Sequence, residues 1–196
     1  MEKTHKAAFL DRDGVINVDK DYLYRIEDFE YEKGALKGLQ ALQDAGYLLV
    51  IITNQSGIAR GYYTEEDYKT LEEWMLADLS KRGIHIAGCY YCPHHPQAAI
   101  VKYRKDCSCR KPKTGLFYQA AWELSIDFNE SIAIGDKERD LSICLETGTK
   151  GFLLCKDKTV KGTVQETDAS FTVTDWEGIC SFLCDANSHS ETASGS

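Results

Sequence analysis

Two carboxylates stand one residue apart near the start of the chain: Asp11 and Asp13 directly follow the apolar run Ala7–Leu10. In an extended segment, residues i and i+2 point to the same side, so both side chains should converge on one small volume. Two anions that close repel each other, and a hard divalent cation with oxygen ligands, such as Mg2+, relieves the repulsion. With that cation in place, one carboxylate can act as a nucleophile and the other can transfer a proton. The alternative for these residues alone is a solvated Asp-Gly turn.

The elements that must position these acids alternate between strands and helices, which predicts an α/β fold with a doubly wound parallel sheet. Continuous apolar runs indicate parallel strands buried on both faces, and apolar residues at helical spacing indicate the helices between them. The expected strands are Ala7–Leu10, Tyr47–Ile52, Ile84–Tyr91, Ser131–Ile134 and Gly151–Leu154. The expected helices carry the apolar sets Ala35, Leu39 and Leu42; Tyr68, Leu71, Met75 and Leu79; and Leu116, Ala120 and Leu124, and a further helix starts near Arg139.

Four polar clusters lie where such a sheet would bring them together. They are Asp11 with Asp13; Thr53-Asn54-Gln55-Ser56-Gly57; Arg110-Lys111-Pro112; and Gly135-Asp136-Lys137, with Asp140 just beyond. Open α/β sheets bind ligands at the carboxyl edge of their strands, where all four clusters are expected. Each cluster alone is more often a turn or a solvated helix approach. Their joint placement at one edge favours a functional site.

The clusters fit phosphoryl transfer, which needs a nucleophile, a proton donor for the leaving group, and donors for the phosphoryl oxygens. Asp11 would attack phosphorus and form an aspartyl-phosphate. Asp13 would protonate the departing alkoxide and then deprotonate the hydrolytic water. The Thr53 hydroxyl, the Asn54 amide and the Lys111 ammonium would hold the phosphoryl oxygens.

The same clusters predict a magnesium site with oxygen ligands. Asp136, together with Asp11 and a backbone carbonyl near Asp13, would hold Mg2+. Asp140 lies one helical turn past Asp136, where it would either support the metal ligands or cap the helix.

At this point a resemblance covers nearly the whole chain, from about Ala8 to Leu154. The motifs that carry it are Asp11-Arg12-Asp13-Gly14, Thr53-Asn54, Lys111 and Gly135-Asp136-Lys137, which resemble the four motifs of the haloacid dehalogenase superfamily of phosphatases. The resemblance implies a Rossmann-like fold with the first Asp as nucleophile and the second as acid and base. Only about forty residues separate the first two motifs, so no inserted cap domain fits and we expect an open active site.

A loop with two short Cys/His pairs, Cys92-Pro-His94 and Cys107-Ser-Cys109, predicts a zinc site. Three thiols and one imidazole suit tetrahedral Zn2+, and a closed set of four protein ligands indicates a structural role. His95 is an alternative fourth ligand, and the family pattern favours His94. We expect the loop over residues 92–109 to hold Arg110 and Lys111 beside the site. The other cysteines, expected to be small buried side chains, are Cys89, Cys144, Cys155, Cys180 and Cys184.

Two capless, zinc-loop groups in this superfamily share the motifs: the D-glycero-D-manno-heptose 1,7-bisphosphate 7-phosphatase family and the histidinol-phosphate phosphatases. The stretches Thr53–Gly61 and Tyr90–Pro96 are more similar to the heptose family. That resemblance implies a substrate loop and further substrate contacts. The implied substrate-binding residues are Asp19, Lys20, Asp21, Tyr22, Gln55, Ser56 and Lys137.

A bisphosphate substrate also gives Arg110 a role, because its planar guanidinium can bind the second, non-reacting phosphate through two hydrogen bonds. Arg60 is a further candidate for this role, with a simple surface position as the alternative. Two other functions stay open: a phosphatase for histidinol phosphate or another small phosphomonoester, and a non-catalytic phosphate- or metal-binding module. The intact pair Asp11 and Asp13 disfavours the second of these.

Composition sets the remaining expectations. The 196 residues carry a net charge of −8, which disfavours nucleic acid as a partner. The sequence has no apolar stretch long enough to span a membrane and no secretion signal, so we expect a cytoplasmic protein. In that setting the eight cysteines indicate metal-bound or buried thiols rather than disulfides. We expect one phosphatase domain over residues 1–185, a disordered tail over 186–196, and a monomer whose partner is a small sugar bisphosphate.

Overall fold

A single sheet forms the centre of the molecule in the computed structural model, which describes residues 4–155, 165–166 and 171–193. Its strands are β1 (Ala7–Leu10), β2 (Leu48–Asn54), β3 (Ile86–Cys92), β4 (Ile132–Gly135), β5 (Lys150–Leu154), β6 (Gln165–Glu166) and β7 (Phe171–Thr174). Their order across the sheet is β3-β2-β1-β4-β5-β7-β6, and every neighbouring pair is parallel except β6 with β7.

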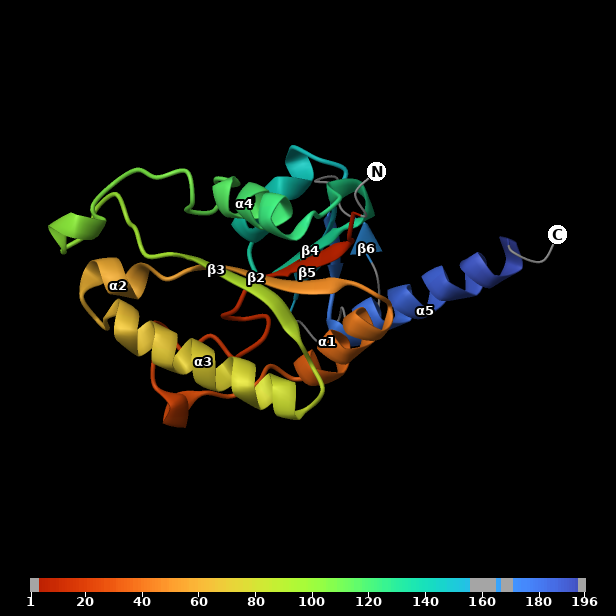
Figure 1. Ribbon diagram of the computed structural model, residues 1–196, viewed down its shortest axis with the longest axis horizontal. Coiled ribbons are helices and arrows are strands. Elements are labelled where there is room, and N and C mark those ends of the chain that lie inside the picture. Colours follow the sequence, from red (N-terminus) through yellow and green to blue (C-terminus); the bar gives the residue numbers. More distant parts are fainter. Residues whose placement is uncertain (1–3, 156–164, 167–170, 194–196) are drawn as a thin grey trace.

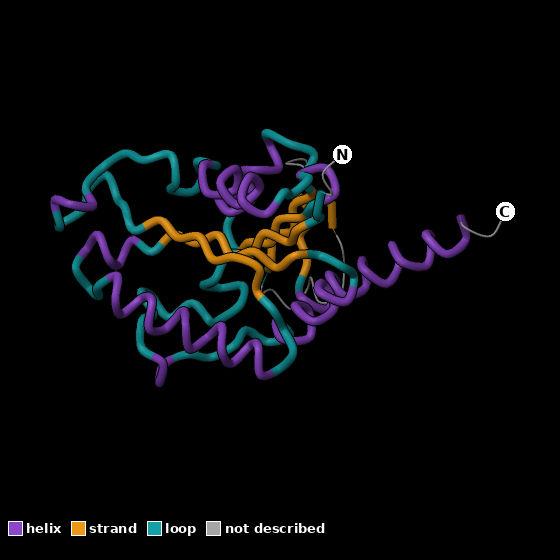
Figure 2. Tube along the Cα trace, in the orientation of Figure 1, coloured by secondary structure: helices purple, strands orange, loops and turns teal. Residues whose placement is uncertain are grey.

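Helices cover both faces of this sheet. The α-helices are α1 (Ala35–Asp44), α2 (Ser56–Arg60), α3 (Glu65–Lys81), α4 (Gly115–Leu124) and α5 (Trp176–Ala193), and the 3-10 helices are η1 (Ile26–Asp28), η2 (Val101–Tyr103), η3 (Phe128–Glu130) and η4 (Glu138–Leu145). Figure 1 shows α1, α3 and α5 below the sheet and α4 above it, and Figure 2 shows the same layers by element type. The predicted doubly wound α/β fold is confirmed.

The residues of β1 explain why the strands read as continuous apolar runs. All four side chains are buried, and they alternate between two cores. Ala8 and Leu10 pack with apolar residues of α1, α3 and α5, whereas Ala7 and Phe9 pack with those of α4. Since helices cover both faces of the central strands, none of these side chains points toward water, and the sequence shows no alternation of apolar and polar residues. The site therefore stands on a strand that packing fixes from two sides.

The five predicted strands are all present, with ends that differ by two residues at most. The edge pair β6 and β7 is an addition, because two and four residues give too short a pattern to be identified in advance. The helix expected near Arg139 is the 3-10 helix η4. Short connections often take this tighter form, so the periodicity placed the element correctly but not its type.

The last helix differs from the expected disordered tail. α5 continues to Ala193, while residues 194–196 lie outside the described part of the chain. Trp176 anchors its start: the ring packs against Gly38 of α1, and the indole N–H donates to the Val15 carbonyl at 3.1 Å. Once a helix is nucleated in this way, each added residue costs little, which is how polar residues can extend it.

Two further expectations concern what the chain lacks. Between β1 and β2, a segment described throughout, the chain forms only loops, η1 and α1, so no cap domain is inserted there. Of the helices in the described residues, none combines the length and the apolar character that crossing a membrane requires.

Candidate active site

The centre of the sheet brings the acids of two motifs together. β1 and β4 are neighbours, and the backbone N–H of Asp11 donates to the Ile134 carbonyl at 3.1 Å, which fixes where both strands end. Carboxylate oxygens of Asp11, Asp136 and Asp140 lie within 4.8 Å of one another; we call these three the carboxylate cluster. The strand order changes direction between β1 and β4, which is the point where open α/β sheets bind ligands.

Gly14 allows this close approach. Its backbone has φ of +85°, and a Cβ there would lie 2.5 Å from an Asp136 oxygen. A side chain would therefore both strain the turn and push Asp136 away.

The carboxylate cluster fits a divalent cation. Burial and the charge of Asp11 raise the pKa of Asp136, and its Oδ1 atom is buried without a hydrogen-bond partner among the described residues. A buried carboxylate oxygen without a partner is costly, and a bound hard cation removes that cost. The Asp13 carboxylate takes no part in this cluster, so any contribution of Asp13 to a magnesium site must come from its backbone.

Lys111 provides a positive charge behind the cluster. Its ammonium lies 3.0 Å from Asp11 and 2.8 Å from Asp140, and it donates to the Ile52 carbonyl at 2.6 Å. Burial raises the pKa of Asp11 to about 6, against the opposing effect of Lys111. Although burial alone would lower it, the two acids raise the pKa of Lys111, which keeps the ammonium charged. Asp140 also accepts from the Lys137 backbone N–H at 3.1 Å, so it both caps η4 and orients Lys111.

Asp13 lies in a separate group of donors. Arg12 donates to both of its oxygens at 2.9 and 3.0 Å, Asn17 donates at 2.9 Å, and Gln55 donates at 3.0 Å. Burial alone would raise the pKa of Asp13, but the Arg12 charge and these hydrogen bonds hold it below the ordinary value. Asp11 and Asp13 thus meet at one pocket with pKa values moved in opposite directions.

Tyr63 positions the glutamine of this group. Its hydroxyl donates to Gln55 Oε1 at 2.5 Å, and the Gln55 amide in turn donates to Asp13 and to the Thr53 hydroxyl. Gly57 makes room for Tyr63, because a Cβ there would lie 2.1 Å from its ring. The hydrogen-bonded chain Tyr63–Gln55–Asp13 therefore holds the acid from the segment between α2 and α3, outside the sheet.

The Asn54 amide makes a two-point clamp on Lys111. Its Nδ2 atom donates to the Lys111 carbonyl and its Oδ1 atom accepts from the Lys111 N–H, both at 3.1 Å. Sequence reasoning assigned this amide to phosphoryl oxygens. In the structure it also holds the backbone of the residue that carries the ammonium.

A pocket of about 240 Å3 opens over these groups. The predicted residues that line it are Asp11, Asp13, Asp19, Asp21, Tyr22, Asn54, Gln55, Ser56, Arg110 and Lys137. Thr53 and Lys111 are buried behind it rather than in its lining. Lys20 points elsewhere: it pairs with Glu30 at 3.1 Å and donates to the Asp28 carbonyl. Because these two contacts hold the Lys20 ammonium, Lys20 does not line the pocket, whereas its neighbour Asp19 does.

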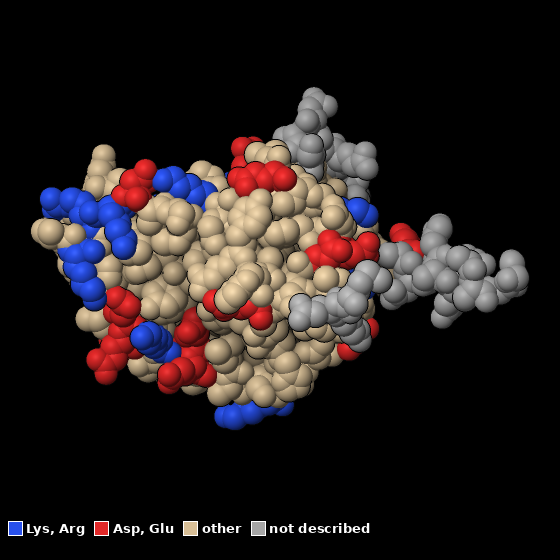
Figure 3. Space-filling model, turned by 45° about the horizontal axis from the view of Figure 1, so that its top comes forward, with Lys and Arg blue, Asp and Glu red and all other residues tan. Residues whose placement is uncertain are grey.

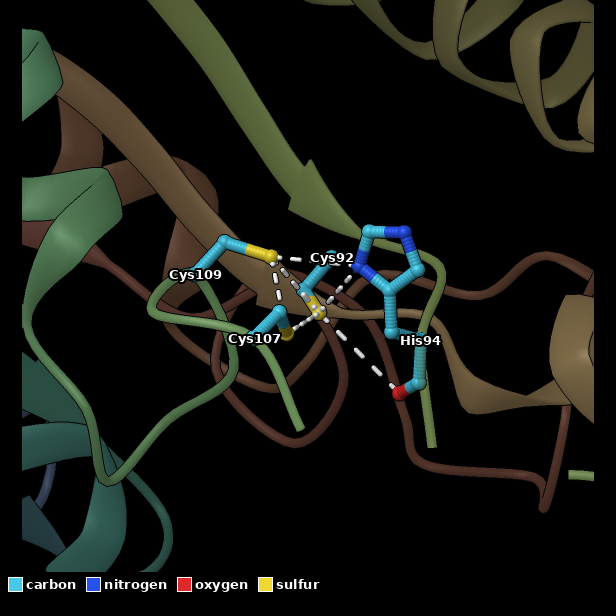
Figure 4. A group of neighbouring side chains, drawn as sticks. All are labelled: Cys92, His94, Cys107 and Cys109. Atoms are coloured by element: carbon cyan, nitrogen blue, oxygen red, sulfur yellow. Dashed lines mark hydrogen bonds between the residues drawn. The ribbon is translucent and has the colours of Figure 1, made fainter. Parts of the chain in front are cut away.

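The predicted zinc ligands converge on one point, as Figure 4 shows. The sulfur atoms of Cys92, Cys107 and Cys109 lie 3.1 to 3.6 Å apart, and His94 Nδ1 lies 3.3 Å from the sulfur of Cys109. Zn–S bonds of about 2.3 Å in a tetrahedron would separate sulfurs by roughly 3.8 Å, so the group is close to the size of a zinc site. We call these four residues the Cys/His cluster.

His95 is not part of the Cys/His cluster. Its Nδ1 accepts from the Gln97 backbone N–H at 3.1 Å, and its Nε2 faces Arg60 at 3.4 Å. The remaining cysteines are less buried than expected: Cys89, Cys144, Cys155 and Cys180 are half-buried, and Cys184 is exposed, contrary to the expectation of small buried side chains. It lies on α5, whose packing the sequence did not specify.

Comparisons with known proteins agree with this geometry. A family model described as HAD-hydrolase-like matches residues 108–175. A D-glycero-alpha-D-manno-heptose-1,7-bisphosphate 7-phosphatase from Photorhabdus laumondii is 49% identical over 136 residues, covering 69% of this chain and 74% of the relative. A D-glycero-beta-D-manno-heptose-1,7-bisphosphate 7-phosphatase from Haemophilus ducreyi is 47% identical over 152 residues, covering 77% and 83%. The chain belongs to the D-glycero-D-manno-heptose-1,7-bisphosphate 7-phosphatase family.

A solved member of this family has the same fold. The D,D-heptose 1,7-bisphosphate phosphatase from B. bronchiseptica, complexed with magnesium and phosphate, has a TM-score of 0.75 at 26% identity and covers 92% of this chain and 99% of its own. The family resemblance that the motifs indicated is confirmed. Membership does not select an anomer, because the two relatives above carry alpha and beta names.

Sequence reasoning missed several residues that build the site. Asn17 and Tyr63 hold Asp13 and Gln55, and neither follows a strand or belongs to a recognised motif. Arg139 lines the pocket, and as one of the few cations next to a strand-end motif it could have been noticed. Burial lowers the pKa of Arg110, the charge of Cys92 opposes this, and the charges of Arg139 and Arg60 lower it further, so three guanidinium groups lie close enough to interact.

Proposed function

We propose that this chain is a Mg2+-dependent phosphatase that removes the 7-phosphate of D-glycero-D-manno-heptose 1,7-bisphosphate and leaves heptose 1-phosphate. The observation that carries the proposal is Asp11, which lines the pocket with the Lys111 ammonium at 3.0 Å behind it. Nearly half of all aligned positions are identical to proteins named for this activity, over more than two thirds of the chain.

In the first half of the reaction, Asp11 attacks phosphorus and the bond to the sugar O7 breaks. Lys111 favours this step because it keeps Asp11 ionised and faces charge that develops on the phosphoryl oxygens. When bound, Mg2+ would be held by the carboxylate cluster and would neutralise negative charge on the phosphoryl group. The product of this half is an aspartyl-phosphate.

Asp13 transfers the protons. In the free protein its donors hold its pKa low, so Asp13 is ionised and can accept a proton from the hydrolytic water. A phosphate dianion entering beside it raises its affinity for a proton, because like charges disfavour the ionised form. Asp13 can therefore carry a proton to O7 when substrate is bound and take one from water after the sugar has left.

The Cys/His cluster would hold Zn2+ as a structural ion. All four positions are supplied by protein side chains, which leaves no open position for substrate or water. Its role is to fix the loop that ends at Arg110 and Lys111, two residues that directly follow Cys109 in the chain.

The second phosphate of the substrate would bind Arg110. This guanidinium lines the pocket, donates to the His94 carbonyl at 3.3 Å and has no carboxylate within ion-pair distance among the described residues. Replacing it by Ala should lower kcat/KM for the bisphosphate by roughly 10- to 1000-fold, whereas a simple monophosphate should lose far less. Equal losses on both substrates would contradict the role of Arg110.

We test the function by comparing kcat/KM for both anomers of heptose 1,7-bisphosphate and for histidinol phosphate, with Mg2+ present and zinc retained. A preference of about 100-fold or more for a heptose anomer, about 2.7 kcal/mol, would support the proposal and identify the anomer. Comparable or faster turnover of histidinol phosphate would leave the mechanism standing and reject the substrate. Turnover of none of them, with the metals bound, would favour a non-catalytic module.

We also propose that the chain acts in the cytoplasm as a monomeric single domain with a small sugar bisphosphate as its partner. The sheet supports one domain, because it draws strands from β1 to β7 along the chain. Sedimentation of the metal-loaded protein tests the oligomeric state.

A further inference from the structure

Resting on the proposed function, we infer that Arg60 and Arg139 join Arg110 to form the subsite for the second phosphate, and that they select bisphosphates over monophosphates. All three line the pocket. They come from separate elements: Arg60 ends α2, Arg110 follows the Cys/His cluster, and Arg139 lies on η4. We call these residues the arginine group.

Among the described residues, the arginine group has only one acidic partner, and that contact is long. Neither Arg60 nor Arg110 has a carboxylate within 4.0 Å among the described residues. Arg139 has only a long contact, 3.8 Å, to Asp140, whose carboxylate already holds Lys111 at 2.8 Å. Three neighbouring guanidinium groups with so little compensating negative charge repel one another, and a phosphate dianion between them would relieve that repulsion.

Two nitrogen atoms of Arg60 lack a hydrogen-bond acceptor among the described residues. Its Nε is buried and has no hydrogen-bond partner among the described residues. Its Nη2 lies 3.4 Å from His95 Nε2, but that contact is not a hydrogen bond. His95 Nδ1 accepts from the Gln97 N–H, so in that ring Nε2 carries the proton, and two donors face each other. An acceptor from outside the protein would satisfy both.

Charge at this end of the molecule agrees with an anionic ligand. In Figure 3, Lys and Arg side chains gather at the left end, which in Figure 1 is formed by α2 and the loop after β3. The exposed members of that loop include Lys102, Arg104 and Lys105. Positive charge gathered at one end of a chain with net charge −8 favours the approach of anions to that end.

The two ends of the pocket then serve two phosphates differently. The reacting phosphate meets the carboxylate cluster, where a cation must mediate the contact. The second phosphate meets guanidinium groups directly, which suits a group that must be held without being activated. A substrate with one phosphate would leave the arginine group unpaired.

The test measures kcat/KM for heptose 1,7-bisphosphate and for heptose 7-phosphate, which has the same reacting phosphate and lacks the other. The protein is the full chain with Mg2+ and zinc. Arg60→Gln and Arg139→Gln should each lower the value for the bisphosphate by about 10- to 100-fold, mainly through KM, and change that for the 7-phosphate by less than about threefold. Arg60→Lys keeps the charge but loses the planar guanidinium, so its kcat/KM for the bisphosphate should lie between those of the wild type and Arg60→Gln.

Arg82→Gln is the matched control. It removes a guanidinium that pairs with Asp78 at the end of α3, outside the pocket, and should change neither substrate. Equal losses on both substrates, or no loss on either, would overturn the inference. If Arg60→Gln does not fold, Arg139→Gln decides, because its side chain is 43% exposed. Failure of the wild-type protein to hydrolyse the bisphosphate would overturn the proposed function instead.

Discussion

The carboxylate cluster and the Cys/His cluster each bring metal-ligating groups together, yet they are held in different ways. The carboxylates follow β1 and β4 in the centre of the sheet, and Lys111 offsets part of their charge. The Cys/His cluster lies at the end of the edge strand β3 and in the loop beyond it, and its ligands contact mainly one another. The comparison shows that parallel strand pairing places the carboxylates, whereas the Cys/His cluster lies mostly in a loop, where the Zn2+ that we propose would hold the ligands together. The carboxylate cluster opens to a pocket and can take part in a reaction, whereas the Cys/His cluster has four protein ligands and can only have a structural role.

The largest effect should come from the carboxylate cluster. Asp11→Asn keeps the shape of the side chain and removes the nucleophile, so kcat should fall by at least about 1000-fold. The thermal midpoint should not fall, because the substitution removes a buried charge near Asp136 and Asp140. Turnover of an aryl phosphate with Mg2+ measures the loss, and Asp44→Asn, an exposed change at the end of α1, is the control. Activity within tenfold of wild type would remove Asp11 from the nucleophile role.

The next largest effect should come from the Cys/His cluster. There, loss of stability should come first and loss of activity should result from it. Cys107→Ser should lower the zinc content and reduce the free energy of unfolding by more than about 2 kcal/mol, because metal binding is coupled to folding. Activity should follow, since Arg110 and Lys111 lose their support. Zinc content, thermal midpoint and kcat/KM are measured beside Cys184→Ser, an exposed thiol outside the cluster. Full activity after zinc is stripped, with Mg2+ retained, would contradict the comparison.

A smaller effect is expected from the support of Asp13. Tyr63→Phe removes the hydrogen bond to Gln55 and should lower kcat by about two- to tenfold, corresponding to about 1 kcal/mol. The neighbouring Tyr62 is 55% exposed, which makes Tyr62→Phe a close control. Stopped assays on the preferred substrate compare the two variants. Equal kcat values for both would mean that Gln55 keeps its place without Tyr63.

The smallest effect is expected at the outer end of the Cys/His loop. Glu65, at the start of α3, accepts from Tyr91 and Tyr103 and pairs with Lys102. The Tyr103 hydrogen bond lowers the pKa of Glu65. A lowered carboxyl pKa contributes stability at pH values above the unfolded pKa, about 4.3, and this contribution is lost as the pH falls through the folded pKa.

Glu65→Gln should therefore reduce the free energy of unfolding by less than about 1 kcal/mol near pH 7, and the difference from wild type should vanish in acid. Denaturant unfolding at several pH values measures it. Glu66→Gln shares the same helix turn but is exposed and lacks these partners, so it controls for the helix dipole. A difference that grows as the pH falls would reverse the assigned sign.

The residues of the site that the sequence could predict are those that stand at or directly after the end of a strand. Asp11, Asn54 and Asp136 follow continuous apolar runs, which indicate strands buried on both faces. In a parallel sheet the ends of such strands meet at one edge, so the three residues are expected to lie together there. The Cys/His cluster was predictable for a different reason, because its ligand types are rare and their spacing is local. Both depend on patterns of a few adjacent residues.

The remaining residues depend on contacts that no local pattern carries. Tyr63 reaches Gln55 across a helix turn that only the packing around Gly57 defines. Strand β7, which pairs with β5 and β6, and the packing of Trp176 against α1 were not predicted, because they depend on which surface of the sheet is still uncovered. Lys20 was assigned to substrate although its own loop turns it toward Glu30. Tertiary context decided each of these.

The clamp between Asn54 and Lys111 has a consequence for chemical durability. A side-chain amide carries the same N–H and C=O pair as a peptide group. The Asn54 side chain, at the end of β2, can therefore pair with the Lys111 backbone as a neighbouring strand would. Only an amide can serve there, because an aspartate would turn a second acceptor toward the Lys111 carbonyl. Deamidation of Asn54 would therefore break this two-point contact with the Lys111 backbone, whereas the Lys111 ammonium would keep its contacts with Ile52, Asp11 and Asp140.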